Sequence, residues 1–208
     1  TDLFDRRLRL NGAVFLNKYE DITLGKTVCP ESSLPAPCLR PANIGTADVT
    51  GFELEASFYP TDGLMFDASI SVLDFEYTSP ASGGNLVGTL IPADGIAPYT
   101  PELSYSVGAQ YDRPLKEGTL SFRLDGSFQD DLYTNAENTF FSTVEGRFLA
   151  NGRVSYSRDE KWRVSLEVQN LFDKYYFVSV SDVTTALGLV TGVPGLPRTW
   201  ALSVERKF

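Results

Sequence analysis

The sequence has no histidine and no apolar run of the roughly 18 residues that a transmembrane helix requires. Without an imidazole, it lacks the most frequent general base near neutral pH and the most frequent transition-metal ligand. Its carboxylates are numerous, but none shows the spacing of a calcium-binding loop or of an acid–base pair. We therefore expect no enzymatic activity and no cofactor.

The chain opens on Thr1 without an initiator methionine, and its start shows neither the basic n-region nor the apolar h-region, of roughly 7–15 residues, of a secretory signal. We expect the chain to be a fragment or one chain of something longer, with any signal peptide either upstream or removed. The formal net charge of −9 is unsuited to the phosphate contacts of a nucleic-acid partner, so we expect no such partner. The apolar content of 42% is too high for a disordered chain.

Alternation of polar and apolar side chains is the main pattern present, and it is clearest in the last residues. A period of two places successive residues on opposite faces of a β-strand. One face of this strand would carry Trp200, Leu202, Val204 and Phe208, and the other Thr199, Ala201, Ser203, Glu205 and Lys207. The sequence therefore predicts a final strand with one apolar and one polar face.

Seven further segments alternate in the same way, so the predicted fold class is all-β, with about eight antiparallel strands. The segments are approximately 7–17, 50–58, 64–77, 103–112, 120–128, 148–156 and 162–169, the last of which continues through 170–180. In the third segment the apolar residues change from even to odd positions after Val72, and we interpret this change as a β-bulge.

The connections between these segments alternate between short and long. The short ones are Pro60–Gly63, Pro114–Gly118 and Arg158–Lys161, and the long ones are approximately 20–45, 78–100, 131–144 and 178–197. In an up-and-down meander, this order places every tight turn at one end of the sheet and every long loop at the other. Transmembrane β-barrels of the outer membrane have this asymmetry.

The alternation alone allows two environments for the apolar face. In a soluble barrel or sandwich this face points inward, whereas in a membrane barrel it faces lipid. The polar face favours the membrane, because it carries charged groups of both signs and few lysines. These inward charges would be Arg7, Arg9, Glu53, Glu55, Asp67, Arg123, Asp125, Arg153, Arg163 and Glu167. Aromatic residues near strand ends, such as Tyr105 and Trp162, are typical of interfacial girdles, and Arg206 would lie close to the rim.

Five stretches resemble the C-terminal part of the TonB-dependent receptors, the energy-coupled transporters of the Gram-negative outer membrane. They are 7–22, 51–64, 100–108, 170–176 (Asn-Leu-Phe-Asp-Lys-Tyr-Tyr) and 197–208, and the resemblance covers essentially the whole chain. It implies a transmembrane barrel of about 22 strands around a plug domain. Residues 1–208 would be the C-terminal barrel segment with the last eight strands, and the plug and the N-terminal strands would lie outside this chain.

The resemblance also implies partners and a location. We expect outer-membrane lipid on the apolar face, extracellular long loops and a periplasmic C-terminus. The partners would be the plug, TonB, the barrel-assembly machinery and a scarce nutrient such as a siderophore, vitamin or carbohydrate. The assembly machinery would recognise the final strand through Trp200, Leu202, Val204 and Phe208. We interpret 170–176 as a structural element, and the inward charges as contacts to neighbouring strands, to the plug or to an anionic ligand.

Cys29 and Cys38 lie in the first long loop. Two cysteines without a histidine make a poor zinc site, and export through the oxidising periplasm favours a disulfide between them. Such a bond would stabilise the loop by roughly 2–3 kcal/mol, and would serve either to grip a ligand or to resist proteolysis.

Two other functions fit the same pattern. A complete eight-stranded barrel could act as a structural or adhesive surface protein. A secreted, lipocalin-like binder would turn its apolar face inward around a ligand. That arrangement would bring five residues together in one interior: Leu10, Leu54, Ile70, Phe122 and Leu202.

Overall fold

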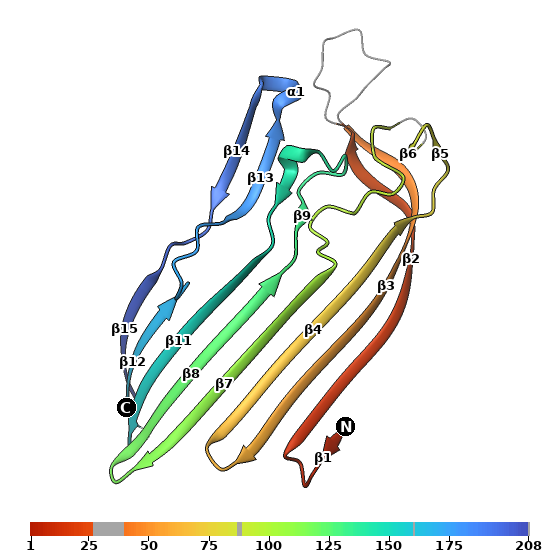
Figure 1. The fold of residues 1–208 in the computed structure, drawn as a ribbon. Helices are drawn as coiled ribbons and strands as arrows, with labels where there is room; N and C mark the ends of the chain where they lie inside the picture. The colour runs from red at the N-terminus through yellow and green to blue at the C-terminus, as the bar shows by residue number, and fades with distance from the viewer. Residues whose placement is uncertain (27–39, 87–88, 160, 208) are drawn as a thin grey trace.

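The long strands form one antiparallel sheet. The computed structural model describes residues 1–26, 40–86, 89–159 and 161–207 (Figure 1). The nine-stranded sheet follows chain order: β1 (Asp2–Leu3), β2 (Leu8–Lys26), β3 (Arg40–Thr61), β4 (Leu64–Tyr77), β7 (Leu103–Leu115), β8 (Gly118–Gln129), β11 (Arg147–Arg158), β12 (Trp162–Gln169) and β15 (Thr199–Arg206). It is open, with β1 and β15 at its edges. The predicted all-β, antiparallel, up-and-down barrel segment is confirmed, and β1 is an additional strand.

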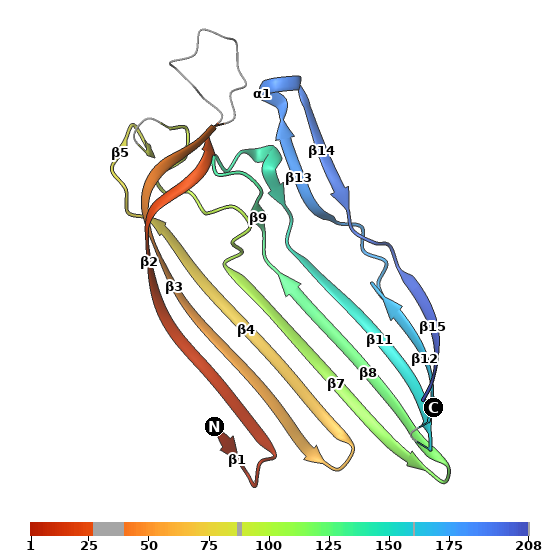
Figure 2. The same ribbon diagram turned by 180° about the vertical axis from the view of Figure 1, so that it is seen from behind.

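The smaller elements belong to the long connections. β5 (Ala81–Ser82) pairs with β6 (Asn85–Leu86), β9 (Leu132–Tyr133) with β10 (Thr143–Val144), and β13 (Phe177–Val183) with β14 (Leu189–Pro194). A 3-10 turn, η1 (Phe140–Ser142), and a single helical turn, α1 (Thr184–Leu187), lie among them. Within the described residues, no helix has the length and apolarity to cross a membrane. Figures 1 and 2 show the long connections at one end of the sheet and the tight turns at the other, as predicted.

The first long connection contains more strand than predicted. β2 and β3 continue far into it, and their pairing extends to the Lys26–Arg40 pair. Much of the predicted 20–45 loop is therefore a hairpin. Cys29 and Cys38 lie outside the described residues.

The predicted β-bulge after Val72 is wrong. The register between β3 and β4 is continuous from the Phe58–Phe66 pair to the Ala47–Tyr77 pair. The apolar residues that follow Val72 therefore lie on the same face as the polar residues that precede it. The surroundings of that face change along the strand, whereas the backbone pattern does not.

A small buried core explains the change. It contains Ile44, Ala47, Tyr77, Leu86, Ile91 and Ala136, with Ile22, Leu24, Phe75 and Ala93 packed against it. These residues come from the loop ends of β2, β3 and β4 and from the connections after β4 and β8. Because the connections cover the sheet at this end, apolar side chains occupy the face that is polar elsewhere.

The predicted continuation of the seventh strand through 170–180 is also wrong. β12 ends at Gln169, and Asn170 has a φ of +50°, in the left-handed region that asparagine tolerates better than most residues. The chain turns there, and β13 then pairs with β14 as a separate hairpin. Part of the predicted strand and much of the predicted 178–197 loop therefore form this hairpin.

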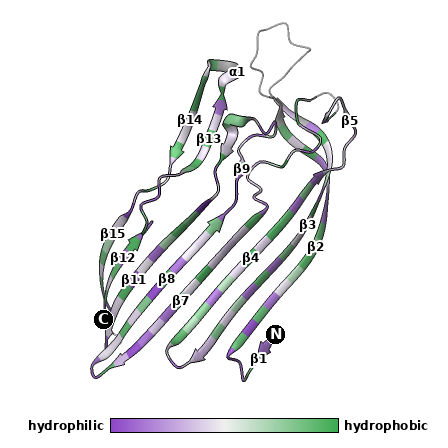
Figure 3. Cartoon of the chain, in the orientation of Figure 1, coloured by the Kyte–Doolittle hydropathy of each residue, from purple (hydrophilic) through white to green (hydrophobic). Residues whose placement is uncertain are grey.

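The two faces of the sheet differ in polarity, as the alternating colours along the strands in Figure 3 show. Large side chains on the apolar face are exposed, including Val14 at 78% and Leu202 at 72%. The lipocalin-like arrangement would bury five apolar residues together in one interior. None of the five belongs to the buried core: Leu10, Leu54, Ile70, Phe122 and Leu202. This exposure argues against the lipocalin-like arrangement.

Candidate functional site on the polar face of the sheet

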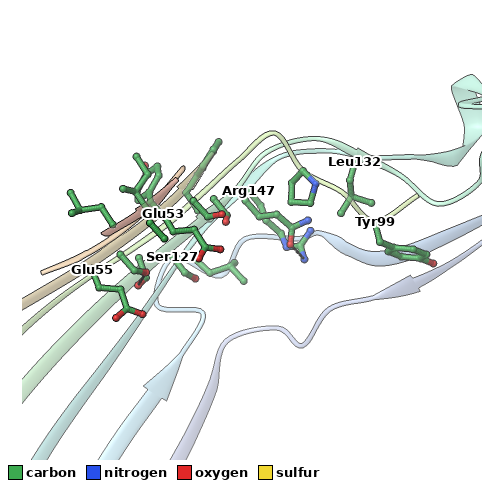
Figure 4. A pocket seen from close by; sticks show the side chains of 18 of the residues that line it. Glu53, Glu55, Tyr99, Ser127, Leu132 and Arg147 are labelled. Atoms are coloured by element: carbon green, nitrogen blue, oxygen red, sulfur yellow. Dashed lines mark hydrogen bonds between the residues drawn. The ribbon is translucent and has the colours of Figure 1, made fainter. Parts of the chain in front are cut away.

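The polar face carries a hollow of about 1060 Å³ that reaches from the strands to the loops (Figure 4). Side chains from β2, β3, β4, β7, β8 and β11 line it, together with residues of the long connections. In Figure 4, Glu53 and Glu55 lie in one part of the hollow, and Arg147, Leu132 and Tyr99 lie toward the other. The hollow therefore has a strand end and a loop end of different composition.

The strand end of the hollow is acidic. Glu53 and Glu55 alternate with apolar residues on β3, so both project from the polar face. Their cross-strand neighbours are small or uncharged: Asn11, Ala13, Ser69 and Ser71. Among the described residues, no cation forms an ion pair with either carboxylate.

Three predicted charges form a bridge across β7. Arg123 in β8 donates from Nη2 to Asp67 Oδ2 at 2.9 Å and from Nε to Asp125 Oδ1 at 2.7 Å. Asp67 lies in β4, so the first bond passes over the strand between them. Gly108 of β7 is paired with both aspartates, and a Cβ atom there would overlap the Arg123 guanidinium. The missing side chain at Gly108 therefore permits the bridge.

Two other arginines on the polar face contact carboxylates of the next strand. Arg153 Nε in β11 is 3.1 Å from Glu167 Oε1 in β12. Arg163 Nη1 in β12 is 3.9 Å from Glu205 Oε2 in β15. These side chains are exposed or half-buried, so each pair contributes little to stability and serves mainly to balance charge along the face.

The first two predicted arginines lie at the tight-turn end of the sheet. Arg9 Nε donates to Asp2 Oδ1 at 2.9 Å, between β2 and β1. Arg7 precedes β2, and its Nη1 donates to the carbonyl oxygen of Pro60 at 3.2 Å. Neither residue lines the hollow.

The final strand places Trp200, Leu202 and Val204 on the apolar face, where all three are exposed. Phe208 lies outside the described residues. Arg206 lies on the same face, and its guanidinium carbon is 4.9 Å from the centroid of the Trp162 ring. This cation–π contact gives the charged group a favourable neighbour close to the rim.

Sequence reasoning missed Arg147, the first residue of β11. Its guanidinium carbon lies 5.0 Å from the centroid of the Tyr176 ring, and its Nη2 donates to Gln129 Oε1 at 3.4 Å. Its Nη1 is shielded from solvent and has no hydrogen-bond partner among the described residues. The even spacing between Arg147 and Arg153, which share one strand face, was the signal that could have identified it.

The 170–176 segment is a structural turn. Asn170 is 5% exposed, and its side-chain amide donates to the carbonyl oxygen of Leu196 at 3.1 Å. Asp173 Oδ1 accepts a hydrogen bond from the backbone amide of Arg198 at 2.9 Å. These bonds tie the end of β12 to the approach to β15, in keeping with the predicted structural role.

Hydrogen bonds also join the connections at the loop end. The hydroxyl groups of Tyr99 and Ser179 are 2.9 Å apart. Thr139 Oγ1 donates to Asp182 Oδ2 at 2.6 Å, and the Thr184 backbone amide donates to Asp182 Oδ1 at 3.0 Å. Because these bonds favour the charged carboxylate, they lower the pKa of Asp182 below its ordinary value.

Residues 1–171 match the family model of the TonB dependent receptor-like β-barrel. The chain therefore belongs to this family, whose members are outer-membrane transport receptors and not enzymes. A curated relative, the ferric-pyoverdine M114 receptor PbuA of Pseudomonas sp. (strain M114), is 26% identical over 211 residues. The alignment covers 99% of this chain and 23% of that receptor.

Solved structures share the fold. The ferric yersiniabactin uptake receptor FyuA of Yersinia pestis matches with a TM-score of 0.77 and 20% identity, over 99% of this chain and 28% of that one. The ferric citrate transporter FecA matches with a TM-score of 0.73 and 20% identity, over 98% of this chain and 29% of that one. The siderophore receptor PiuA of Acinetobacter baumannii matches with a TM-score of 0.71 and 22% identity, over 100% of this chain and 27% of that one. This chain thus spans about a quarter of the length of its relatives.

Proposed function

We propose that this chain is the C-terminal part of the barrel wall of an outer-membrane receptor that imports an iron chelate with energy supplied through TonB. The observation that carries the proposal is an open up-and-down sheet, exposed along its apolar face, in a chain that matches this family over residues 1–171. An uncovered apolar face of this kind is stable when lipid covers it. Relatives named for ferric pyoverdine, ferric yersiniabactin and ferric citrate support chelated iron as the ligand class.

The plug domain, the other barrel strands and the TonB-engaging segment would lie outside residues 1–208. The other strands would pair with the open edges at β1 and β15, and the plug would face the polar side. Glu53 and Glu55 are exposed and form no ion pair with any described residue. They would meet basic groups of the plug, because a plug that covers them would otherwise bury two unpaired carboxylates. Of the remaining inward charges, Asp67, Arg123, Asp125, Arg153 and Glu167 would balance one another along the wall. Arg9 and Arg163 would be balanced by Asp2 and Glu205, and Arg7 donates to the carbonyl oxygen of Pro60.

The orientation in the membrane follows from the loop lengths. The tight turns would lie in the periplasm and the long connections outside the cell. A disulfide between Cys29 and Cys38 would then hold an extracellular loop. The barrel-assembly machinery would recognise the exposed apolar face of β15 during insertion.

Iron uptake by the intact receptor tests the proposal. Cells that lack their own chelate receptors would carry the full-length receptor and be supplied with ⁵⁵Fe-loaded chelates, with and without functional TonB. We expect TonB-dependent accumulation of ⁵⁵Fe and recovery of the receptor in the outer-membrane fraction. Uptake that is indifferent to TonB, or recovery of the receptor in the soluble fraction, would contradict the proposal.

Labelling of single cysteines tests the orientation. Ser82→Cys lies at an exposed long connection and Asp62→Cys at an exposed tight turn. A membrane-impermeant maleimide should label the first variant in intact cells, and the second only after the outer membrane is opened. The unsubstituted receptor is the control for reaction at Cys29 and Cys38.

A further inference from the structure

The loop end of the hollow differs from the strand end in charge. Glu53 and Glu55 lie at the strand end, whereas Arg147 is the charged residue of the lining toward the loops (Figure 4). The side chains that line the loop end with it are aromatic, aliphatic or hydroxylic: Tyr99, Leu132, Val178 and Ser179.

The guanidinium of Arg147 is not neutralised by any described residue. Its contacts are the Tyr176 ring and a long hydrogen bond to Gln129, and its Nη1 is covered yet unpaired. Arg123 and Arg153, on the same face, each contact at least one carboxylate. A partly buried cation without a counter-charge is costly, so this position favours an anion supplied from elsewhere.

The surroundings of Arg147 restrict what that anion can be. The nearby carboxylate of Asp131 accepts a hydrogen bond from the Gly146 backbone amide and forms no ion pair with Arg147. A guanidinium held against an aromatic ring is preorganised to bind an oxyanion, and here it would do so through the N–H groups other than those of the covered Nη1. The acidic strand end would repel the same anion, and so would keep it at the loop end.

We propose that Arg147, held by Tyr176, is a subsite for a negatively charged group of the imported iron chelate, and that this receptor selects anionic over cationic chelates. The inference rests on the proposed function and specifies the charge of its ligand. A carboxylate of the plug is the competing occupant. The ligand is favoured because Tyr99 and Val178, from the long connections, border the Arg147 end, where a molecule arriving from the loop side would first make contact.

The test compares variants of the intact receptor in the ⁵⁵Fe assay. The probes are ferric citrate and a ferric tris-catecholate, which are anionic, and ferric tris-hydroxamates that are neutral or cationic. Arg147→Gln should weaken binding and uptake of the anionic chelates by about tenfold or more, since hydrogen bonds to charged groups are worth about that much. Arg147→Lys should restore part of the loss, and Tyr176→Leu should cause a smaller loss.

The matched control is Arg163→Gln, which removes an arginine of the same face near the tight turns and outside this hollow. It should leave uptake unchanged. Heat-modifiable migration on gels shows whether each variant has folded. If a folded Arg147→Gln variant keeps anionic uptake, or loses uptake of all chelates equally as a plug contact would, the subsite is wrong and the receptor function stands. Preference for cationic chelates would likewise overturn the subsite alone, whereas uptake of none of the probes overturns both proposals.

Discussion

The two halves of β4 present the same face to opposite surroundings. Toward the tight turn, Asp67 and Ser69 lie among the polar groups of neighbouring strands, and Asp67 joins the bridge to Arg123. Toward the loops, Phe75 and Tyr77 pack edge to face, with ring centroids 4.7 Å apart, in or against the buried core. The pairing with β3 is continuous through both halves. Whether this face carries polar or apolar side chains is therefore determined by what covers it, because the strand pairing of the backbone is the same in both halves.

The cover comes from the connections after β4 and β8. Leu86 is 1% exposed and Ile91 is 3% exposed, and both belong to the first of these connections. Ala136, from the second, completes the core. The loop half thus behaves as a small soluble core attached to a membrane wall, and a substitution of the same kind should have different effects in the two halves.

The largest effect is expected from a charge placed in the loop half. Ala47 is 0% exposed and lies beside Tyr77, so Ala47→Asp buries a carboxylate without a partner. We expect it to destabilise the packing of residues 89–97 by about 3 kcal/mol or more. Hydrogen exchange of the intact receptor should show faster exchange in peptides from this segment.

The matched control places the same side chain in the strand half. Ser155→Asp adds a carboxylate to the polar face, where the cross-strand neighbours Ser121 and Ser165 are uncharged. Exchange of residues 89–97 should not change. If residues 89–97 exchange equally fast in the two variants, the two halves do not differ in the way we describe.

The second largest effect is expected in the strand half, at Gly108. Gly108→Leu would drive a side chain into the space of the Arg123 guanidinium and separate it from Asp67. Overpacking and loss of the bridge should together cost about 2–4 kcal/mol, measured by urea unfolding of the receptor in detergent. Gly12→Ala is the control, since a Cβ atom there meets neighbours at 3.5 Å, an ordinary contact distance. If Gly108→Leu is as stable as Gly12→Ala, the bridge does not depend on the missing side chain.

The strands and tight turns were predictable because alternation and turn residues are local properties. The sequence could not reveal that Leu73, Phe75 and Tyr77 keep their face, since alternation does not show what covers a strand. It also could not distinguish a continued β12 from the hairpin of β13 and β14. That difference depends on Asn170, whose backbone and side-chain bonds reach distant segments.

The candidate site was predictable only in part, for a related reason. Alternation places Glu53 and Arg123 on the polar face, but pairing depends on contacts across strands. Arg123 reaches Asp67, 56 residues away, over a glycine, whereas Glu53 has uncharged neighbours. Arg147 was missed because its environment is created by Tyr176, beyond the end of β12.

A smaller effect is expected from removing one hydroxyl in the loop half. Burial raises the pKa of Tyr77 to about 12, and its hydroxyl has no hydrogen-bond partner among the described residues. Tyr77→Phe should therefore leave the core intact and raise its stability by up to about 1 kcal/mol. Hydrogen exchange of residues 89–97 measures the change, and Tyr77→Leu, which loses the contact with Phe75, is the destabilised control. Faster exchange in Tyr77→Phe would show that the hydroxyl is satisfied.

The smallest effect is expected at Asp182, a carboxylate in β13 at the loop end of the molecule. Hydrogen bonds from Thr139 and Thr184 lower the pKa of Asp182 below 3.8, so their stabilising contribution is complete above that value and is lost as the pH falls through the folded-state pKa. Thr139→Val removes one of these bonds and moves the folded-state pKa back toward 3.8, so the loss should be smaller and should be complete at a higher pH. A spin label at Leu187→Cys, an exposed position next to β14, reports the change as increased mobility. The control is Thr191→Val, because Thr191 is exposed and is not among the described hydrogen-bond donors to Asp182. Its profile of spin-label mobility against pH should follow that of the unsubstituted receptor. If the Thr139→Val and Thr191→Val profiles are identical, the Thr139 bond does not hold the hairpin.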